Sequence, residues 1–228
     1  MSLTHLDANR SMPLVTLPLR TSVAELKGAR VLFAPASTLS PARYSEAGEI
    51  TDIVVPNLYH LEGAGPAMAA HPKARLWLPA GAEAKDKRAL PHSVLGKDSW
   101  PYEEELPLFP LGGMPAVAES VLLHRASGSL LVGDLAFNLI DASGLGARLI
   151  FGLFGTYQRF AVSRLFLRGV SDRAAFLRSL EELLAQDFSA LVPTHGNIVA
   201  TEARERLRSA LGERGVHIGG RSAPPTDS

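Results

Sequence analysis

Apolar and polar positions follow two different periods along the chain, and each period predicts a different element. Runs of apolar residues of strand length occupy residues 13–19, 29–35, 51–56, 74–79 and 188–193. Short apolar runs bounded by Pro, Gly or polar clusters are typical of buried strands. Residues 116–126 and 129–138 flank the pair Ser127 and Gly128, and this arrangement predicts a β-hairpin.

Helical periodicity predicts further elements between and after these strands. Residues 65–72 predict a short helix that ends at Pro72. Ser171 is a suitable N-cap for a helix over 172–186, in which five apolar residues fall on one face: Phe176, Leu177, Leu180, Leu183 and Leu184. Residues 198–214 predict a terminal amphipathic helix. Strands interspersed with helices, without a repeat or a linker, favour a single-domain α/β layered architecture.

Two segments predict less regular structure. Residues 85–115 are rich in Pro and Gly, which predicts loops and short strands. Residues 145–167 are apolar and aromatic but contain three arginines, and we interpret them as a pair of core-packing helices. The same segment could instead cover an apolar substrate pocket or lie on a lipid surface. Residues 219–228 are expected to be frayed.

Composition excludes several classes of protein. The 228 residues are 46% hydrophobic and 20% charged, as in a packed globule, and 23 Lys and Arg balance 23 Asp and Glu. With this balance of charge, the protein has no overall positive potential that would attract nucleic acid or an anionic membrane. With no cysteine, thiolate metal ligands and cysteine nucleophiles are excluded. No secretory signature or long apolar run is present, so we expect a cytoplasmic protein without a membrane span.

Three strands run directly into residues that can bind a metal. His60 ends "DIVVPNLYH", Asp134 ends "SLLVGD", and His195 belongs to "SALVPTHG". Side chains at strand ends, held by a rigid sheet, commonly form functional sites. Each residue also has an ordinary alternative, because a histidine there is often only hydrogen-bonded and an Asp after Gly often caps a turn. Only a tertiary fold could bring these distant positions together.

The order of these segments resembles that of the metallo-β-lactamase-like hydrolase superfamily. "LVPTHG" is similar to its late "ivPgHG" element, and "LLVGDLAF" to its "lltGDllf" element, whose Asp bridges two metals. The resemblance extends from about Pro13 to about Arg214. It implies a four-layer αββα sandwich over residues 1–214, followed by a C-terminal tail at 215–228, with a dinuclear metal site along one edge of the two sheets.

The signature of that superfamily, T-H-x-H-x-D-H-x-x-G, is altered in this chain. His60 and Gly63 match its final H-x-x-G. That alignment places Val55 and Asn57 at the first two His positions and Tyr59 at the Asp position. Valine cannot bind a metal and asparagine is a weak oxygen donor, so the resemblance does not extend to the first metal site.

The third His of the first metal site corresponds to the segment "AESVLLHRASGS". Glu119 is the favoured occupant of that position, and His124 is the weaker alternative. Of the four ligands of the second metal, the chain retains His60, Asp134 and His195. We therefore expect a mononuclear site that holds one divalent metal ion, zinc first with iron or manganese as alternatives, or no metal at all.

The candidate catalytic residues are Asp134 and His60, with Asp134 orienting a metal-activated water or acting as its base. Glu62 could accept from an imidazole N–H or could be a solvated turn residue, and Tyr59 could be a donor near the site or simple packing, which we favour. Further candidate site residues are Asn57, Tyr59, Glu62 and Glu119. Asn138 and Asn197 are placed for hydrogen bonds to a substrate.

These residues predict a metal-dependent hydrolase that activates water toward a small-molecule substrate. The alternative is a non-catalytic member of the fold that has lost the dinuclear site and serves as a binding or interaction module. The retained His-Asp-His set favours metal binding, because an empty site has no need of these three residue types.

Overall fold

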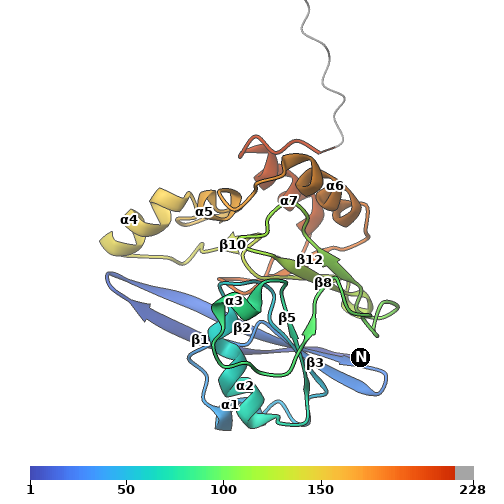
Figure 1. Cartoon of the computed structure of the whole chain (residues 1–228). Coiled ribbons are helices and arrows are strands. Elements are labelled where there is room, and N and C mark those ends of the chain that lie inside the picture. The colour runs from blue at the N-terminus through green and yellow to red at the C-terminus, as the bar shows by residue number, and fades with distance from the viewer. Residues whose placement is uncertain (219–228) are drawn as a thin grey trace, which may run out of the picture.

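Two β-sheets lie face to face at the centre of the molecule, and helices cover their outer faces (Figure 1). The computed structural model describes residues 1–218. The first sheet has the strand order β1 (Leu3–Met12), β2 (Val15–Leu26), β3 (Ala29–Phe33), β4 (Asp52–Val54), β5 (Arg75–Leu78) and β6 (Ser93–Val94). Its first three strands are antiparallel, and its strands from β3 onward are parallel.

The second sheet has the order β12 (Ala190–Pro193), β9 (Ser129–Val132), β8 (Ser120–His124) and β7 (Leu108–Pro110). Strands β8 and β9 form the predicted hairpin through a short 3₁₀ turn, and β12 pairs with β9 in parallel. A separate ribbon joins β10 (Phe137–Asn138) to β11 (Phe160–Ala161).

Most helices divide between the two outer faces. Beside the first sheet lie α1 (Pro41–Ser45), α2 (Ala64–Ala70) and α3 (Ala82–Lys85), and beside the second lie α5 (Arg164–Leu167), α6 (Arg173–Leu184) and α7 (Ala203–Gly212) (Figure 1). Helix α4 (Leu145–Phe154) packs instead against β2 at the β1–β2 hairpin. Among residues 1–218, no helix is long and apolar enough to cross a membrane.

Side chains alternate between the two faces of each strand, and this alternation packs each sheet against the other sheet on one side and against helices on the other. In β3, Val31 and Phe33 pack between the sheets, whereas Leu32 packs toward α1 and α2. In β9, Leu131 faces the space between the sheets, and Leu130 packs toward α6 and α7. Successive strand residues point to opposite faces, so the central strands of both sheets are buried on both sides. This gives the four-layer αββα arrangement that the resemblance implied.

Strand β1 is the main element that sequence reasoning missed. It pairs with β2 over its whole length, from Leu3 opposite Ala24 to Met12 opposite Val15. Strand β1 is an edge strand whose side chains are exposed or only partly buried, so its sequence lacks an apolar run. Strand β2 likewise continues to Leu26, past the predicted end at residue 19.

Helix boundaries also differ from prediction. The N-cap of α6 is Asp172 and not Ser171, because the Asp172 carboxylate accepts from the Ala175 N–H at 3.0 Å. Helix α7 begins at Ala203 and not at residue 198, since Val199 still exchanges backbone hydrogen bonds with Leu191. The boundary placed at residue 214 stays a prediction, and the tail predicted at 219–228 lies outside the described residues.

The segment from 145 to 167 forms two helices, as predicted, but they are separated by β11 and only partly buried. Phe151 and Phe166 are buried, whereas Leu145, Leu149 and Leu153 are exposed on the outer side of α4. The interpretation of this segment as purely core-packing is therefore wrong for α4.

Candidate metal centre

The three candidate ligands meet because the strands before them end at the same edge of the sandwich. In the second sheet, Pro193 of β12 lies opposite Val132 of β9 in parallel register. Asp134 and His195 each follow two residues later, so they emerge side by side. His60 reaches the same edge from the first sheet. It lies in the segment that follows β4, directly before a 3₁₀ turn at Leu61–Gly63.

The Asp134 carboxylate lies between the two imidazoles. His60 Nε2 is 3.3 Å from Asp134 Oδ2, and His195 Nε2 is 3.2 Å from Oδ1. The two imidazole nitrogens and the carboxylate oxygen all lie within 4.8 Å of one another, and the three side chains are nearly buried. Two imidazoles and one carboxylate match the donors of catalytic zinc and non-haem iron sites, so these residues fit a single divalent metal.

A backbone carbonyl fixes the orientation of His195. Its Nδ1 lies 3.0 Å from the Pro18 carbonyl oxygen, which can only accept, so Nδ1 carries the proton. Its ring stacks on Phe137 with centroids 4.8 Å apart and an interplanar angle of 6°. Both contacts direct Nε2 toward Asp134, and a hydrogen bond from the distal nitrogen to a carbonyl is typical of metal-binding histidines.

Opposing effects act on the pKa of Asp134. Burial alone would raise this pKa, but the facing imidazoles of His60 and His195 lower it well below its usual range. The group therefore remains a carboxylate at neutral pH. A carboxylate is the form that a metal ligand or a hydrogen-bond acceptor requires.

Asn57 and Glu119, which the resemblance assigned to the positions of a first metal site, form a hydrogen-bonded bridge. Asn57 Nδ2 donates to Glu119 Oε2 at 2.5 Å and to Asp134 Oδ2 at 2.7 Å. Its Oδ1 accepts from the Tyr59 N–H at 2.9 Å, which identifies the donor end of the amide.

The Glu119 carboxylate is occupied by backbone donors. Its Oε1 accepts from the N–H groups of Gly133 at 2.8 Å and Asp134 at 3.0 Å, with Leu135 at 3.3 Å. Burial, followed by repulsion from the Asp134 carboxylate, raises the pKa of Glu119 to about 8, although its hydrogen bonds act in the opposite direction. Because this carboxylate already accepts several N–H bonds and no imidazole lies on the bridge, the residues do not fit a second metal.

Of the other predicted residues, Tyr59 and Glu62 line the cavity that contains the centre without contacting a candidate ligand, and His124 does not line it. Tyr59 is 50% exposed beneath the Lys85 ammonium, so its interpretation as packing is wrong. The Glu62 carboxylate pairs with Arg10 at 2.9 Å and not with an imidazole. His124 is hydrogen-bonded to a serine of the β8–β9 turn, away from the centre.

A mostly apolar cavity of about 300 Å³ opens beside the centre. All three candidate ligands line it, together with side chains from the β1–β2 hairpin, from β10 and from helices α4 and α5. Sequence reasoning missed the hairpin residues Arg10, Met12 and Leu19, because no motif marks them. Their contribution depends on the register of β1, which carries no clear strand pattern.

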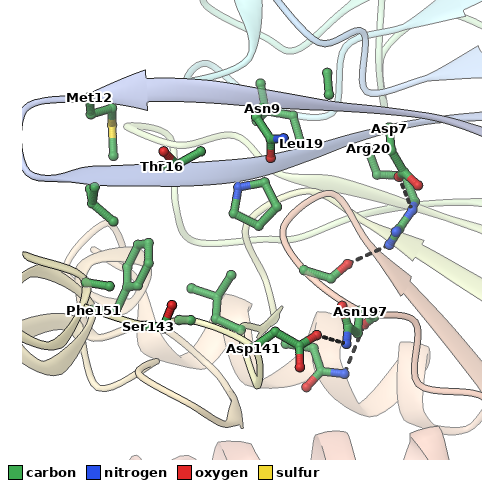
Figure 2. Close-up of a pocket in the computed structure, with 18 of the residues that line it drawn as sticks. Asp7, Asn9, Met12, Thr16, Leu19, Arg20, Asp141, Ser143, Phe151 and Asn197 are labelled. Atoms are coloured by element: carbon green, nitrogen blue, oxygen red, sulfur yellow. Dashed lines mark hydrogen bonds and ion pairs between the residues drawn. The ribbon is translucent and has the colours of Figure 1, made fainter.

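A second cavity of about 800 Å³ lies on the other side of the hairpin and shares Met12, Leu19 and Phe151 with the first (Figure 2). Its polar residues bond mainly to one another. Arg20 Nη1 donates to the Gly196 carbonyl at 2.6 Å, and Asn197 Nδ2 donates to Asp141 at 2.7 Å (Figure 2). These contacts hold the loop that follows His195, so Asn197 has a structural partner in place of the predicted substrate contact.

Comparison with known proteins gives similarity at the level of structure. No family model and no curated protein matches the sequence. Among solved structures, a metallo-β-lactamase from Erythrobacter litoralis aligns with TM-score 0.64 and 14% identity, covering 92% of each chain. A metallo-β-lactamase from Pontibacter korlensis aligns with TM-score 0.62 and 13% identity, over 92% of this chain and 94% of that one.

A third match is the metallo-β-lactamase FIM-1 from Pseudomonas aeruginosa in its mono-zinc form. It aligns with TM-score 0.59 and 12% identity, over 94% of this chain and 92% of its own. At such identities the matches establish a common fold and nothing about substrate.

Proposed function

We propose that this chain, which has the metallo-β-lactamase fold, is a metal-dependent hydrolase of a small molecule with a mononuclear centre of His60, Asp134 and His195. The observation that carries the proposal is their convergence: three ligand atoms of suitable type lie within 4.8 Å of one another in the wall of a cavity. The bridge of Asn57 and Glu119 supports a single metal, because it fills the neighbouring position with hydrogen bonds.

Each residue has a distinct part in the chemistry. A divalent metal held by these three side chains would supply Lewis acidity and lower the pKa of water. The Pro18 carbonyl keeps the proton of His195 on Nδ1, so that Nε2 offers its lone pair to the site. Asn57 Nδ2 donates to Asp134 Oδ2 and so holds the carboxylate in place, which leaves Oδ1 free of that bond beside His195 Nε2.

The donor set does not select one metal. Zinc suits two imidazoles and a carboxylate with an open position, and iron or manganese suits the same set. We favour zinc, because hydrolysis requires no change of oxidation state.

The experiment is a hydrolysis screen on protein stripped of metal and reloaded separately with Zn²⁺, Mn²⁺ or Fe²⁺. Esters, thioesters, lactones, lactams and phosphodiesters are the substrates. We expect activity that returns with one metal and is lost in the double variant His60→Ala, His195→Ala. His92→Ala is the matched control, because His92 pairs with Glu83 at 3.3 Å and does not line the cavity beside the centre. Equal activity in the double variant and the wild type would refute the proposal, as would inactivity with every metal and substrate.

A further inference from the structure

We propose that the cavity beside the metal centre binds the compact apolar acyl group of a neutral ester or thioester. The inference rests on the proposed function, because it places the carbonyl carbon against His60, Asp134 and His195. It adds the substrate class, which neither the ligand set nor the fold determines.

The first support is the lining of the cavity. Ten of its nineteen lining residues are apolar, and they come from separate parts of the chain. Leu19 comes from β2, Phe154 from α4 and Leu165 from α5. An apolar wall with a few polar groups gathered at one end is the usual form of a site for a small apolar ligand. Here three of the nine polar lining residues are the candidate ligands.

The second support is the charge of the lining. Apart from the three candidate ligands, the charged residues among the described lining are Arg10 and Glu62. They pair with each other at 2.9 Å, and their side chains are 43% and 64% exposed. A carboxylate or phosphate on the substrate would therefore meet a paired cation at the rim and apolar side chains inside, and burying such an anion without a partner is costly. The lining favours a neutral substrate.

The third support is size. A cavity of about 300 Å³ is at the lower end of the range for small-molecule sites, so the acyl group must be short. Leu165 is the residue best placed to set its length, because it lines the cavity from α5 while remaining 43% exposed, so a larger side chain can be accommodated there.

The reaction is a hydrolysis and needs water as its only co-reactant. The water oxygen forms a bond to the acyl carbonyl carbon, and the bond from that carbon to the ester oxygen or thioester sulfur breaks. The products are the carboxylic acid and the alcohol or thiol, which takes up one proton from the water. No oxidant or reductant is required.

The first test measures binding without turnover. Straight-chain primary amides, from propanamide to decanamide, are titrated calorimetrically into the metal-free protein as neutral, stable substitutes for the acyl group. We expect affinity to rise about fourfold with each added CH₂ group until the cavity is full and then to fall. Leu165→Trp should weaken the best amide at least tenfold, which is on the order of 1.4 kcal/mol. Leu149→Trp, on the exposed outer face of α4, should leave it unchanged.

The second test measures kcat/KM of the reloaded protein for 4-nitrophenyl esters of the same acyl lengths. We expect the same optimum as for the amides, shifted to shorter chains by Leu165→Trp. Affinity independent of chain length, or equal effects of both Trp variants, would overturn the substrate class even if the protein binds metal. If the protein binds no metal but the amide series behaves as expected, the proposed hydrolase activity is refuted, whereas the proposal that the cavity binds an acyl group is supported.

Discussion

Replacement of Glu119 by Ala tests whether the bridge with Asn57 holds the centre together. Glu119 is 1% exposed and joins β8 to the turn after β9. Its carboxylate accepts from the Asn57 amide and from the backbone N–H groups of Gly133 and Asp134. The substitution removes all these acceptors at once and leaves the donors buried.

The magnitude follows from the donors left without a partner. Each buried donor that loses its acceptor costs about 1–3 kcal/mol. Three strongly bonded donors would give about 3–9 kcal/mol, and entry of water into the vacated space reduces this figure. We expect Glu119→Ala to lower the free energy of unfolding by about 3–5 kcal/mol. Glu119→Gln keeps one acceptor oxygen for the backbone and should cost about half as much.

The assay is equilibrium unfolding in urea on metal-free protein, with the midpoint and slope compared with those of the wild type. The control is Glu182→Ala, because Glu182 is an exposed residue of α6. A Glu119→Ala variant within about 1 kcal/mol of the wild type, with an unchanged slope, would show that the bridge contributes little and would refute the reasoning.

Three further predictions concern the loop beside the centre, the residue that supports this loop, and one buried acceptor of the first sheet. In Gly196→Ala, the new Cβ would lie 2.1 Å from the Asn138 carbonyl at a φ of +96°, so we expect a loss of at least about 2 kcal/mol in urea unfolding; wild-type stability would contradict this geometry. Arg20→Met removes the donor that holds the Gly196 carbonyl, and it should weaken metal binding about tenfold in competition with a chromophoric chelator; undiminished affinity would show that the loop needs no such support. Asp52 lies at the start of β4 and does not line the cavity beside the centre. Asp52→Ala removes the buried acceptor of the Trp77 indole N–H and should cost about 1–3 kcal/mol without changing metal content; loss of metal in a folded variant would show that this bond supports the centre.

The sequence predicted the strands that carry apolar runs, because their side chains are buried on both faces. It failed at β1, an edge strand that pairs along ten residues without an apolar run of its own. It also placed the start of α7 too early, because the pairing of Val199 with Leu191 is a tertiary contact that periodicity does not reveal.

The candidate site was predictable only where a residue type marked it. His60, Asp134 and His195 stand at strand ends, and the structure brings them together as that pattern suggested. The contact of Asn57 with Glu119 spans 62 residues, and the hydrogen bond of His195 to the Pro18 carbonyl spans 177. The first contact depends on the register of the sheets. The second uses a backbone carbonyl, which every residue has, so no side-chain motif predicts either contact.

The central claim is that one metal, and not two, is held by His60, Asp134 and His195. The most direct test is elemental analysis of metal bound per chain, after purification without chelator and reconstitution with Zn²⁺, Mn²⁺ or Fe²⁺. The structure predicts about one equivalent in the wild type and none in the double variant His60→Ala, His195→Ala. Two equivalents in the wild type would show that the bridge of Asn57 and Glu119 gives way to a second metal. No metal under any of these conditions would refute the centre itself.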